Sequence, residues 1–128
     1  MQKPVPGISG EEAIRDIHKA IDYLSDVSKK YGIEINIHLN PTYVATGTEL
    51  ETAYHKGEYS PPALPEVAQA AIYAADKRVS IFIGLSDEGL AVEGGSFIRN
   101  GDEPIVEQLE LFNRTQDYHI IERIIRVE

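Results

Sequence analysis

An alternating segment from Ile33 to Leu39, followed at once by a loop that contains proline and glycine, most restricts how this chain can fold. Isoleucine or leucine occupies every second position of the segment, so one face of an extended chain is apolar and the other is polar. The polar face carries Glu34, Asn36, His38 and Asn40. The pattern predicts a β-strand whose apolar face lies on the core and whose polar face meets either water or a binding site.

The loop after this strand suits both a chain reversal and a ligand site. Pro41 fixes its own backbone torsion and favours an extended conformation at Asn40, while Gly47 permits a close backbone approach. A short helix is predicted from Thr48 to Lys56, and Pro61-Pro62 interrupts the chain after it. The loop therefore either holds a ligand or serves the chain reversal alone.

Helices are predicted on both sides of the alternating segment. Ser9 and Glu12 form a candidate capping box, Gly32 is a candidate helix stop, and apolar residues recur between them at helical spacing. These apolar residues are Ile14, Ile17, Ile21, Leu24, Val27 and Tyr31. A second long helix is predicted from Pro65 to about Lys77, and a second alternating strand from Val79 to Leu85.

The C-terminal part of the chain is harder to interpret. Asp87-Glu88-Gly89 predicts a turn, and the turn residues within Ala91 to Asn100 leave room for a short strand or hairpin only. A helix is predicted after Asp102, with Pro104 near its first position. Its inner face would carry Val106, Leu109 and Phe112. The Ile-rich segment Tyr118 to Val127 is predicted as a strand, with a helix as the alternative.

The order of these elements predicts the fold class. Helices that alternate with strands favour parallel strand pairing through right-handed crossovers. We therefore expect an α/β fold with about three main parallel strands and crossover helices. At 128 residues and 42% hydrophobic content, the chain is expected to form a single domain over residues 1–128.

Charge and cysteine content exclude or disfavour several functions. A formal charge of −9 disfavours direct nucleic-acid binding, which depends on clustered Lys and Arg. The absence of cysteine excludes disulfides and Cys-rich zinc sites. No bound metal is expected, because the histidines are scattered and no second ligand lies at a suitable spacing from His38.

No apolar run approaches the roughly 20 residues of a membrane-spanning helix, and the N-terminus lacks a signal-peptide pattern, so we expect a cytoplasmic protein.

The loop and the helix after it carry a longer motif. It reads Pro41-Thr42-Tyr43-Val44-Ala45-Thr46-Gly47-Thr48-Glu49-Leu50, followed by Gly57-Glu58-Tyr59 and by Pro61-Pro62. This motif resembles the one that follows the last barrel strand of radical SAM proteins of the archaeosine-biosynthesis type and of the catalytic subunit of Elongator. Shorter matches to the archaeosine type extend over nearly the whole chain, at Lys3-Pro4, Glu11-Glu12-Ala13-Ile14 with Asp16, and Leu111-Phe112-Asn113-Arg114-Thr115-Gln116-Asp117.

The resemblance implies a fold and a function. The chain would correspond to the final portion of a partial TIM barrel plus a C-terminal extension, and the complete protein would modify a nucleoside or another small group by radical chemistry. Asn36, His38 and Asn40 would line the cavity for S-adenosylmethionine and substrate. Backbone groups of the loop, which includes Pro41 and Thr42, would contact the adenine, with Val44 in apolar contact and Gly47 and Thr48 shaping the turn.

The chain also departs from this family. A [4Fe–4S] cluster needs thiolate ligands, and the chain has no cysteine, so it cannot generate the radical by itself. The family has Trp where this chain has Pro65. We therefore expect a separated or excised C-terminal portion of such a protein, or a diverged relative, whose partner is the rest of the barrel or a second copy. No cofactor is expected in the isolated chain, and the cluster and S-adenosylmethionine would belong to the full-length protein.

A different class of function remains open. The chain can be a free-standing, non-catalytic binding or assembly module that buries an exposed sheet edge against a partner. The two alternatives differ in what meets the polar face of the first strand. A cut barrel leaves this face open, whereas a self-contained module is expected to cover it with its own Ala91 to Asn100 segment.

Overall fold

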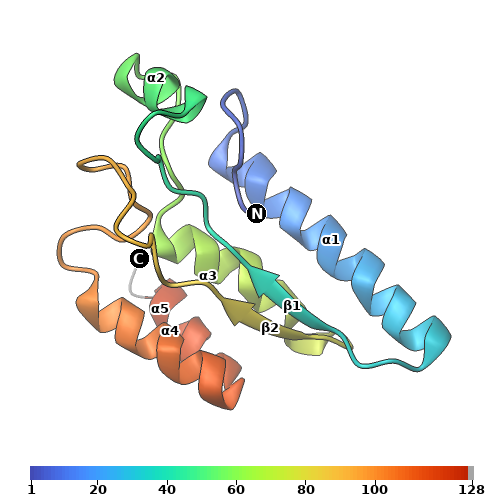
Figure 1. Cartoon of the computed structure of the whole chain (residues 1–128). Coiled ribbons are helices and arrows are strands. Elements are labelled where there is room, and N and C mark those ends of the chain that lie inside the picture. Colours follow the sequence, from blue (N-terminus) through green and yellow to red (C-terminus); the bar gives the residue numbers. More distant parts are fainter. Residues whose placement is uncertain (127–128) are drawn as a thin grey trace.

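The structure is a computed structural model that describes residues 1–126. These residues form five α-helices, one short 3-10 helix and two β-strands (Figure 1). In chain order the elements are α1 Gly10–Tyr31, β1 Asn36–Leu39, α2 Glu49–His55, α3 Leu64–Ile72, η1 Tyr73–Asp76, β2 Ser80–Ile83, α4 Glu103–Thr115 and α5 Tyr118–Arg126. The fold is therefore mixed α/β, as the order of elements predicted.

The long helix α1 begins and ends where the sequence predicts. The hydroxyl of Ser9 accepts a hydrogen bond from the backbone N–H of Glu12, and Gly32 ends the helix in the left-handed conformation with φ 63°. Ile33 N–H then donates to Ser28 O at 3.3 Å, and Ser28 Oγ donates to Ile33 O at 2.6 Å. Ile33 thus belongs to the helix end rather than to a strand, and 47% of it is exposed. The expected strand from Ile33 begins only at Asn36.

The sheet consists of two parallel strands within the described residues. Strand β1 pairs with β2 in the register Asn36 to Ser80 through Leu39 to Ile83. Leu39, Ile81 and Ile83 are buried against the helices, as the alternating patterns predicted. Parallel pairing is confirmed, but the second strand is shorter than the predicted Val79 to Leu85.

Four helices, α1, α3, α4 and α5, contribute to the main core together with the two strands. Figure 1 shows α3 behind the strands, α1 along one side, and α4 with α5 beside β2. Buried residues of α3 include Val67, Ala68 and Ala71, whose small side chains let the helix pack closely. Their partners in the same cluster are Ile21, Leu64, Ile81, Phe97, Leu109, Phe112 and Ile121. The side of the sheet away from these helices is not part of the core.

The prediction of a third strand at Tyr118 to Val127 is wrong, and its helical alternative holds for the described part. Tyr118–Arg126 is α5, and Val127 lies outside the described residues. Its buried residues are Ile120, Ile121 and Ile124. This spacing forms one stripe along a helix, whereas a strand would place adjacent isoleucines on opposite faces. Residues 1–126 therefore contain two strands where about three were expected.

The remaining helices agree with the sequence prediction within a few residues. Thr48 caps α2, and the helix predicted from Pro65 to Lys77 is α3 continued by the 3-10 turn η1. In α4 Leu109 and Phe112 are buried, and Pro104 lies in the first turn after Asp102. No helix in residues 1–126 is both long enough and apolar enough to cross a membrane.

Candidate binding site at the carboxyl end of the sheet

The two parallel strands end side by side, and their following loops enclose a cavity. β1 ends at Leu39 and β2 at Ile83, a paired position, so the loops that start at Asn40 and Gly84 leave the sheet from the same edge. A cavity of about 270 Å³ lies there. It is lined by Met1, Asn40, Pro41, Tyr43, Gly84, Ser86 and Glu88. Ligands of open α/β sheets bind at this carboxyl edge, because the loops that differ in sequence converge there.

Gly84 allows the two loops to approach each other closely. Its N–H donates to Leu39 O at 2.9 Å, which extends the β1–β2 pairing by one step. A Cβ atom at this position would lie 2.6 Å from Oδ1 of Asn40. Any larger residue here would require the Asn40 amide to move from its position next to Gly84. The predicted site residue Asn40 is therefore exposed at the rim of the cavity.

The polar face of the sheet is open to solvent. Asn36 and His38 are exposed, and the His38 ring stacks on Phe82 with 5.7 Å between ring centroids and an interplanar angle of 25°. Two predicted site residues thus lie on the open face, next to an aromatic ring from the other strand. Phe82 is half-buried, so this face combines polar groups with an apolar surface.

The segment from Ala91 to Asn100 lies elsewhere. Val44 N–H donates to Gly95 O at 2.8 Å, and Val92 N–H donates to Val44 O at 2.8 Å. A single antiparallel bridge joins Ala45 to Ala91, and Phe97 is buried in the main core. The segment therefore packs along the loop after β1 and leaves the polar face of the sheet uncovered.

Three of the predicted loop residues are buried. Pro41 and Thr42 lie against the N-terminal residues, where Thr42 N–H donates to Gln2 O at 3.3 Å. Val44 is fully buried and forms a small second core with Ala53 of α2 and Tyr59. The Val44 side chain thus anchors the loop to this small core. Of the three buried residues, only Pro41 also lines the cavity.

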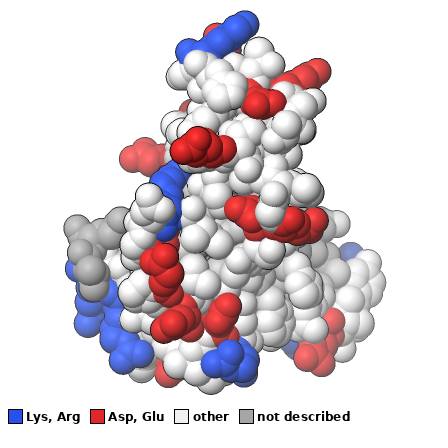
Figure 2. Space-filling view, turned by 60° about the vertical axis from the view of Figure 1, so that its left-hand side comes forward, with Lys and Arg blue, Asp and Glu red and all other residues white. Residues whose placement is uncertain are grey.

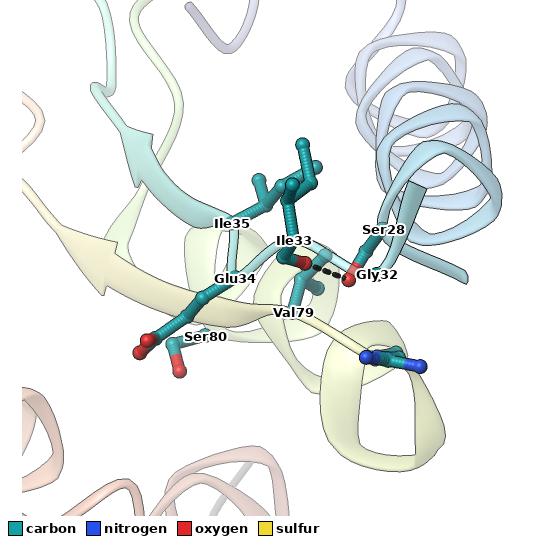
Figure 3. A pocket seen from close by; sticks show the side chains of 8 residues that line it. Ser28, Gly32, Ile33, Glu34, Ile35, Val79 and Ser80 are labelled. Carbon is teal, nitrogen blue, oxygen red and sulfur yellow. Dashed lines mark hydrogen bonds between the residues drawn. The ribbon is translucent and has the colours of Figure 1, made fainter. Parts of the chain in front are cut away.

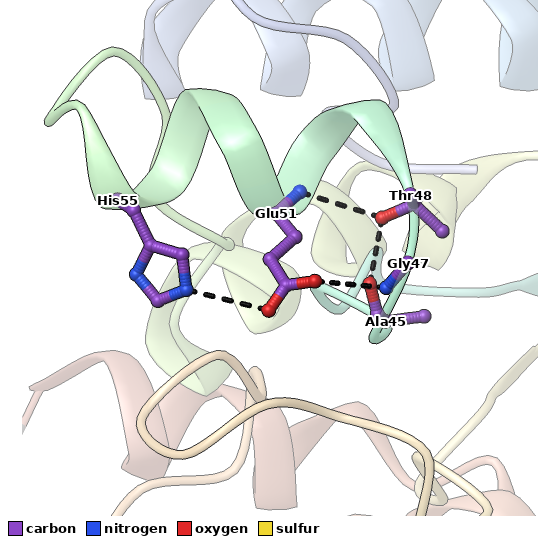
Figure 4. Close-up of polar contacts among 5 residues, drawn as sticks. All are labelled: Ala45, Gly47, Thr48, Glu51 and His55. Carbon is purple, nitrogen blue, oxygen red and sulfur yellow. Dashed lines mark hydrogen bonds and ion pairs between the residues drawn. The ribbon is translucent and has the colours of Figure 1, made fainter.

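Gly47 and Thr48 shape the turn into α2 (Figure 4). Gly47 has φ +83°, which favours glycine, and its N–H donates to Glu51 Oε1 at 2.8 Å. Thr48 Oγ1 donates to Ala45 O at 2.7 Å and accepts from Glu51 N–H at 3.4 Å. His55 Nε2 lies 3.4 Å from Glu51 Oε2. The hydrogen bond from Gly47, and secondly the contact with His55, lowers the pKa of Glu51 below its ordinary value.

Tyr59 and Gln2 tie the N-terminal residues to this loop. The Tyr59 hydroxyl donates to Lys3 O at 2.6 Å, and burial raises the pKa of Tyr59 to about 12. Gln2 is 1% exposed, and its Nε2 donates to Glu66 O of α3 at 3.3 Å. Gln2 is thus held beside the end of β1, and the chain turns at Lys3, which has φ 57°.

Tyr43 lies in the loop that the sequence singled out, whereas sequence reasoning missed the other cavity residues Met1, Gly84, Ser86 and Glu88. Gly84 carried a signal, because a glycine inside a strand pattern often marks a close backbone approach. The others carried none, since their position depends on which loops the parallel pairing brings together.

A second cavity, of about 370 Å³, lies at the opposite, amino edge of the sheet (Figure 3). It is lined by Ser28, Gly32, Ile33, Glu34, Ile35, Arg78, Val79 and Ser80. The hydrogen bond from Ser28 to Ile33 is part of the helix end described above. Of the polar-face residues that the sequence pointed to, only Glu34 lines this cavity, and none of the predicted cofactor-binding residues does.

The structure bears on which cofactors the chain itself can hold. Among the residues that the structure describes, no group of three or more His, Asp or Glu side chains is arranged to hold a metal ion. The chain has no thiolate to offer an iron–sulfur cluster. The cavity at the carboxyl edge has an aromatic ring, an amide, a hydroxyl and a carboxylate, groups that can bind a small polar molecule.

Comparison of the chain with protein-family models, with curated proteins and with solved structures gave no match.

Proposed function

We propose that this chain is the C-terminal segment of a radical SAM enzyme, that it forms part of the wall of the cavity for S-adenosylmethionine and substrate, and that it is not catalytically competent alone. The observation that carries the proposal is the uncovered polar face of a parallel strand pair with a cavity at its carboxyl edge. A self-contained module is expected to cover that face, and the segment from Ala91 to Asn100 packs elsewhere.

The position of the motif supports the proposal independently. The segment from Pro41 to Leu50, which carries the resemblance to radical SAM proteins, begins at the carboxyl edge and borders the cavity. In barrels of parallel strands the catalytic and binding residues lie at this edge. This position supports the proposal, although in the family the motif follows the last barrel strand and here a further parallel strand, β2, comes after it.

The cavity has groups that fit the adenosine part of S-adenosylmethionine. The ring of Tyr43 offers a stacking surface, and the amide of Asn40 and the hydroxyl of Ser86 offer hydrogen bonds to a nucleoside. S-adenosylmethionine supplies the adenosyl group for the radical reaction of the complete enzyme. The cluster that anchors its methionine part does not fit this chain, so another part of the enzyme must supply the cysteines.

Titration of the isotope-labelled full chain with adenosine tests the site. We expect weak, millimolar binding, with nuclear magnetic resonance shift changes concentrated at residues 40–44 and 84–88. Gly84→Ala should reduce these changes, because the added methyl group would lie too close to the present position of the Asn40 amide and force it to move. Ser60→Ala, at an exposed position outside this cavity, is the control that should leave them unchanged.

Uridine serves as the ligand control, since its smaller ring should give weaker shift changes at the same residues. The proposal is contradicted if adenosine at millimolar concentration changes no shift at the cavity, or if Gly84→Ala binds as the parent chain does. In that case the free-standing binding or assembly module becomes the better description.

A further inference from the structure

The two edges of the sheet are not equivalent. The outer edge of β2 is closed by side-chain amides of α4 and of the residue after it. Asn113 Nδ2 donates to Ile83 O at 2.9 Å, and Ile83 N–H donates to Asn113 Oδ1 at 2.9 Å. Gln116 Nε2 donates to Ile81 O at 2.8 Å, and Ile81 N–H donates to Gln116 Oε1 at 3.2 Å. We refer to these two residues as the amide clamp.

The amide clamp occupies the groups that a further strand would need. Ile81 and Ile83 are two residues apart, so their backbone groups point to the same edge of the strand. Each amide satisfies one N–H and one C=O, as a neighbouring strand would. A strand that joined this edge would have to displace four hydrogen bonds. The sheet is therefore closed on the side of β2.

The outer edge of β1 is paired only just beyond its carboxyl end, where Gln2 forms a bridge with Pro41. Ile35 O and Leu39 O accept hydrogen bonds from Ser80 and Gly84, so the intervening residues Asn36 and His38 turn their backbone groups outward. In the described residues, β2 is the only strand paired with β1. Asn36 and His38 are also exposed. Their N–H and C=O groups form an open strand edge of the kind that pairs with further polypeptide.

The first residues of the chain determine the direction and register of such pairing. Gln2 forms an isolated parallel bridge with Pro41, in which Gln2 N–H donates to Asn40 O at 3.1 Å and Thr42 N–H donates to Gln2 O. A strand that continues this bridge toward the amino-terminal side runs along β1 past His38 and Asn36, parallel to it. Gln2 is held there by its burial and by α3.

We propose that the open edge of β1 takes up one parallel strand, the neighbouring strand of the barrel that the proposed function assigns to this chain, in the register of the Gln2–Pro41 bridge. This inference rests on the proposed function for the identity of the strand. The amide clamp closes the sheet on the side of β2, so a further strand can join it only at β1. The added strand would extend the polar face of the sheet beyond β1. It would also form the part of the proposed cavity wall that lies next to His38.

Hydrogen exchange in an extended chain tests this proposal. A short alternating strand of Thr and Val is joined to the amino side of Met1 in the full chain. We expect the amides of Asn36 and His38 to exchange at least about tenfold more slowly than in the parent chain, because they become hydrogen-bonded. Magnetisation transfer between the new strand and β1 should show parallel pairing. The same extension with Pro in place of every second residue is the control, and it should leave Asn36 and His38 unprotected.

The amides of Ile37 and Leu39, which face β2, report whether the fold is intact. The proposal is overturned if they stay protected while Asn36 and His38 gain no protection, or if the added strand pairs with β2 or runs antiparallel to β1. If the extended chain does not fold, the Thr and Val strand is added as a separate peptide to the unmodified chain, and absence of protection at saturating peptide also overturns the proposal.

Adenosine binding is measured separately on the parent chain. Strand pairing without adenosine binding would count against the proposed function alone, and adenosine binding without strand pairing against the present inference alone.

Discussion

Single residues decide how closely the loops of this protein can approach each other. Gly84 leaves room for the amide of Asn40, and Gly47 takes a left-handed conformation that places its N–H on Glu51. The sequence predicted that Gly47 shapes a turn, and the structure confirms it. It did not indicate that Glu51 is the partner, because a capping box would direct this carboxylate to the N–H of Thr48.

We predict that Glu51→Gln destabilises the fold in a pH-dependent way. The hydrogen bond from Gly47 lowers the folded-state pKa of Glu51 below 4.5, so the charged carboxylate favours the folded state. This contribution is complete above pH 4.5 and is lost as the pH falls through the lower, folded-state pKa. Urea unfolding should therefore show Glu51→Gln to be less stable than the parent chain at neutral pH, with the difference shrinking in acid.

The control for this prediction is Glu49→Gln. It removes the same charge from the same turn of α2 but leaves the hydrogen bond between Gly47 and Glu51 in place. An equal loss of stability in both variants at neutral pH would show that the general charge of the turn matters and that the contact with Gly47 does not.

At the scale of the elements, the amide clamp explains how a sheet of only two strands is held in position. Its residues Asn113 and Gln116 are three apart on and just after α4, and they meet backbone groups two apart on β2. A helix thus replaces a third strand at this edge. The segment that was expected to be a third strand is α5, whose isoleucines pack on α3 and α4.

We predict that Asn113→Ala lowers the free energy of unfolding by about 1–3 kcal/mol, because the partly buried N–H and C=O of Ile83 lose their partners. The opened edge should also promote self-association, visible as a concentration-dependent sedimentation coefficient. Asn100→Ala, in an exposed loop, is the matched control and should change neither quantity. A monomeric Asn113→Ala variant of unchanged stability would contradict the clamp.

Two leucines of α4 provide a second test at this scale. Leu109 is fully buried and Leu111 is 41% exposed, although both lie on the same helix. We predict that Leu109→Ala lowers the free energy of unfolding by about 2–5 kcal/mol, because it leaves a cavity beside Phe112 in the core. Leu111→Ala should stay within about 0.5 kcal/mol. Urea unfolding measures both, and similar losses would mean that α4 packs with a different face.

At the scale of the whole molecule, the main features are the acidic surface and the uncovered polar face of the sheet. Figure 2 shows Asp and Glu side chains spread over much of one face, with Lys and Arg in separate groups near its margins. This distribution agrees with the formal charge of −9. If the chain is the barrel segment proposed above, its uncovered polar face and open strand edge would depend on neighbouring strands for a complete site.

We predict that the native polypeptide in its source cells is much heavier than 14.2 kDa. An antibody against this segment, followed by intact-mass measurement, checks the size. Under the proposed function, the same protein should show iron–sulfur absorption after anaerobic purification, because a cluster would need cysteines that this chain lacks. A native mass of 14.2 kDa would contradict the barrel-segment function.

The sequence by itself determined the local elements. The capped helix from Ser9 to Gly32, the helix after Thr48 and the two alternating strands were all predictable, because capping and side-chain periodicity act between residues close in the chain. The alternation also predicted that Asn36 and His38 lie on a polar face. It failed at Tyr118 to Val127, where a run of isoleucines suits either a strand or a helix until its packing partners are known.

Only the tertiary structure decided which distant groups meet. The bridge from Gln2 to Pro41, the cavity between Asn40 and Gly84, and the amide clamp on β2 each join residues far apart in the chain. No periodicity encodes such contacts, because they depend on the register of the parallel strands and on the position of α4. The same contacts close one edge of the sheet and leave the other open, which is the basis of the proposed role of this chain in a larger barrel.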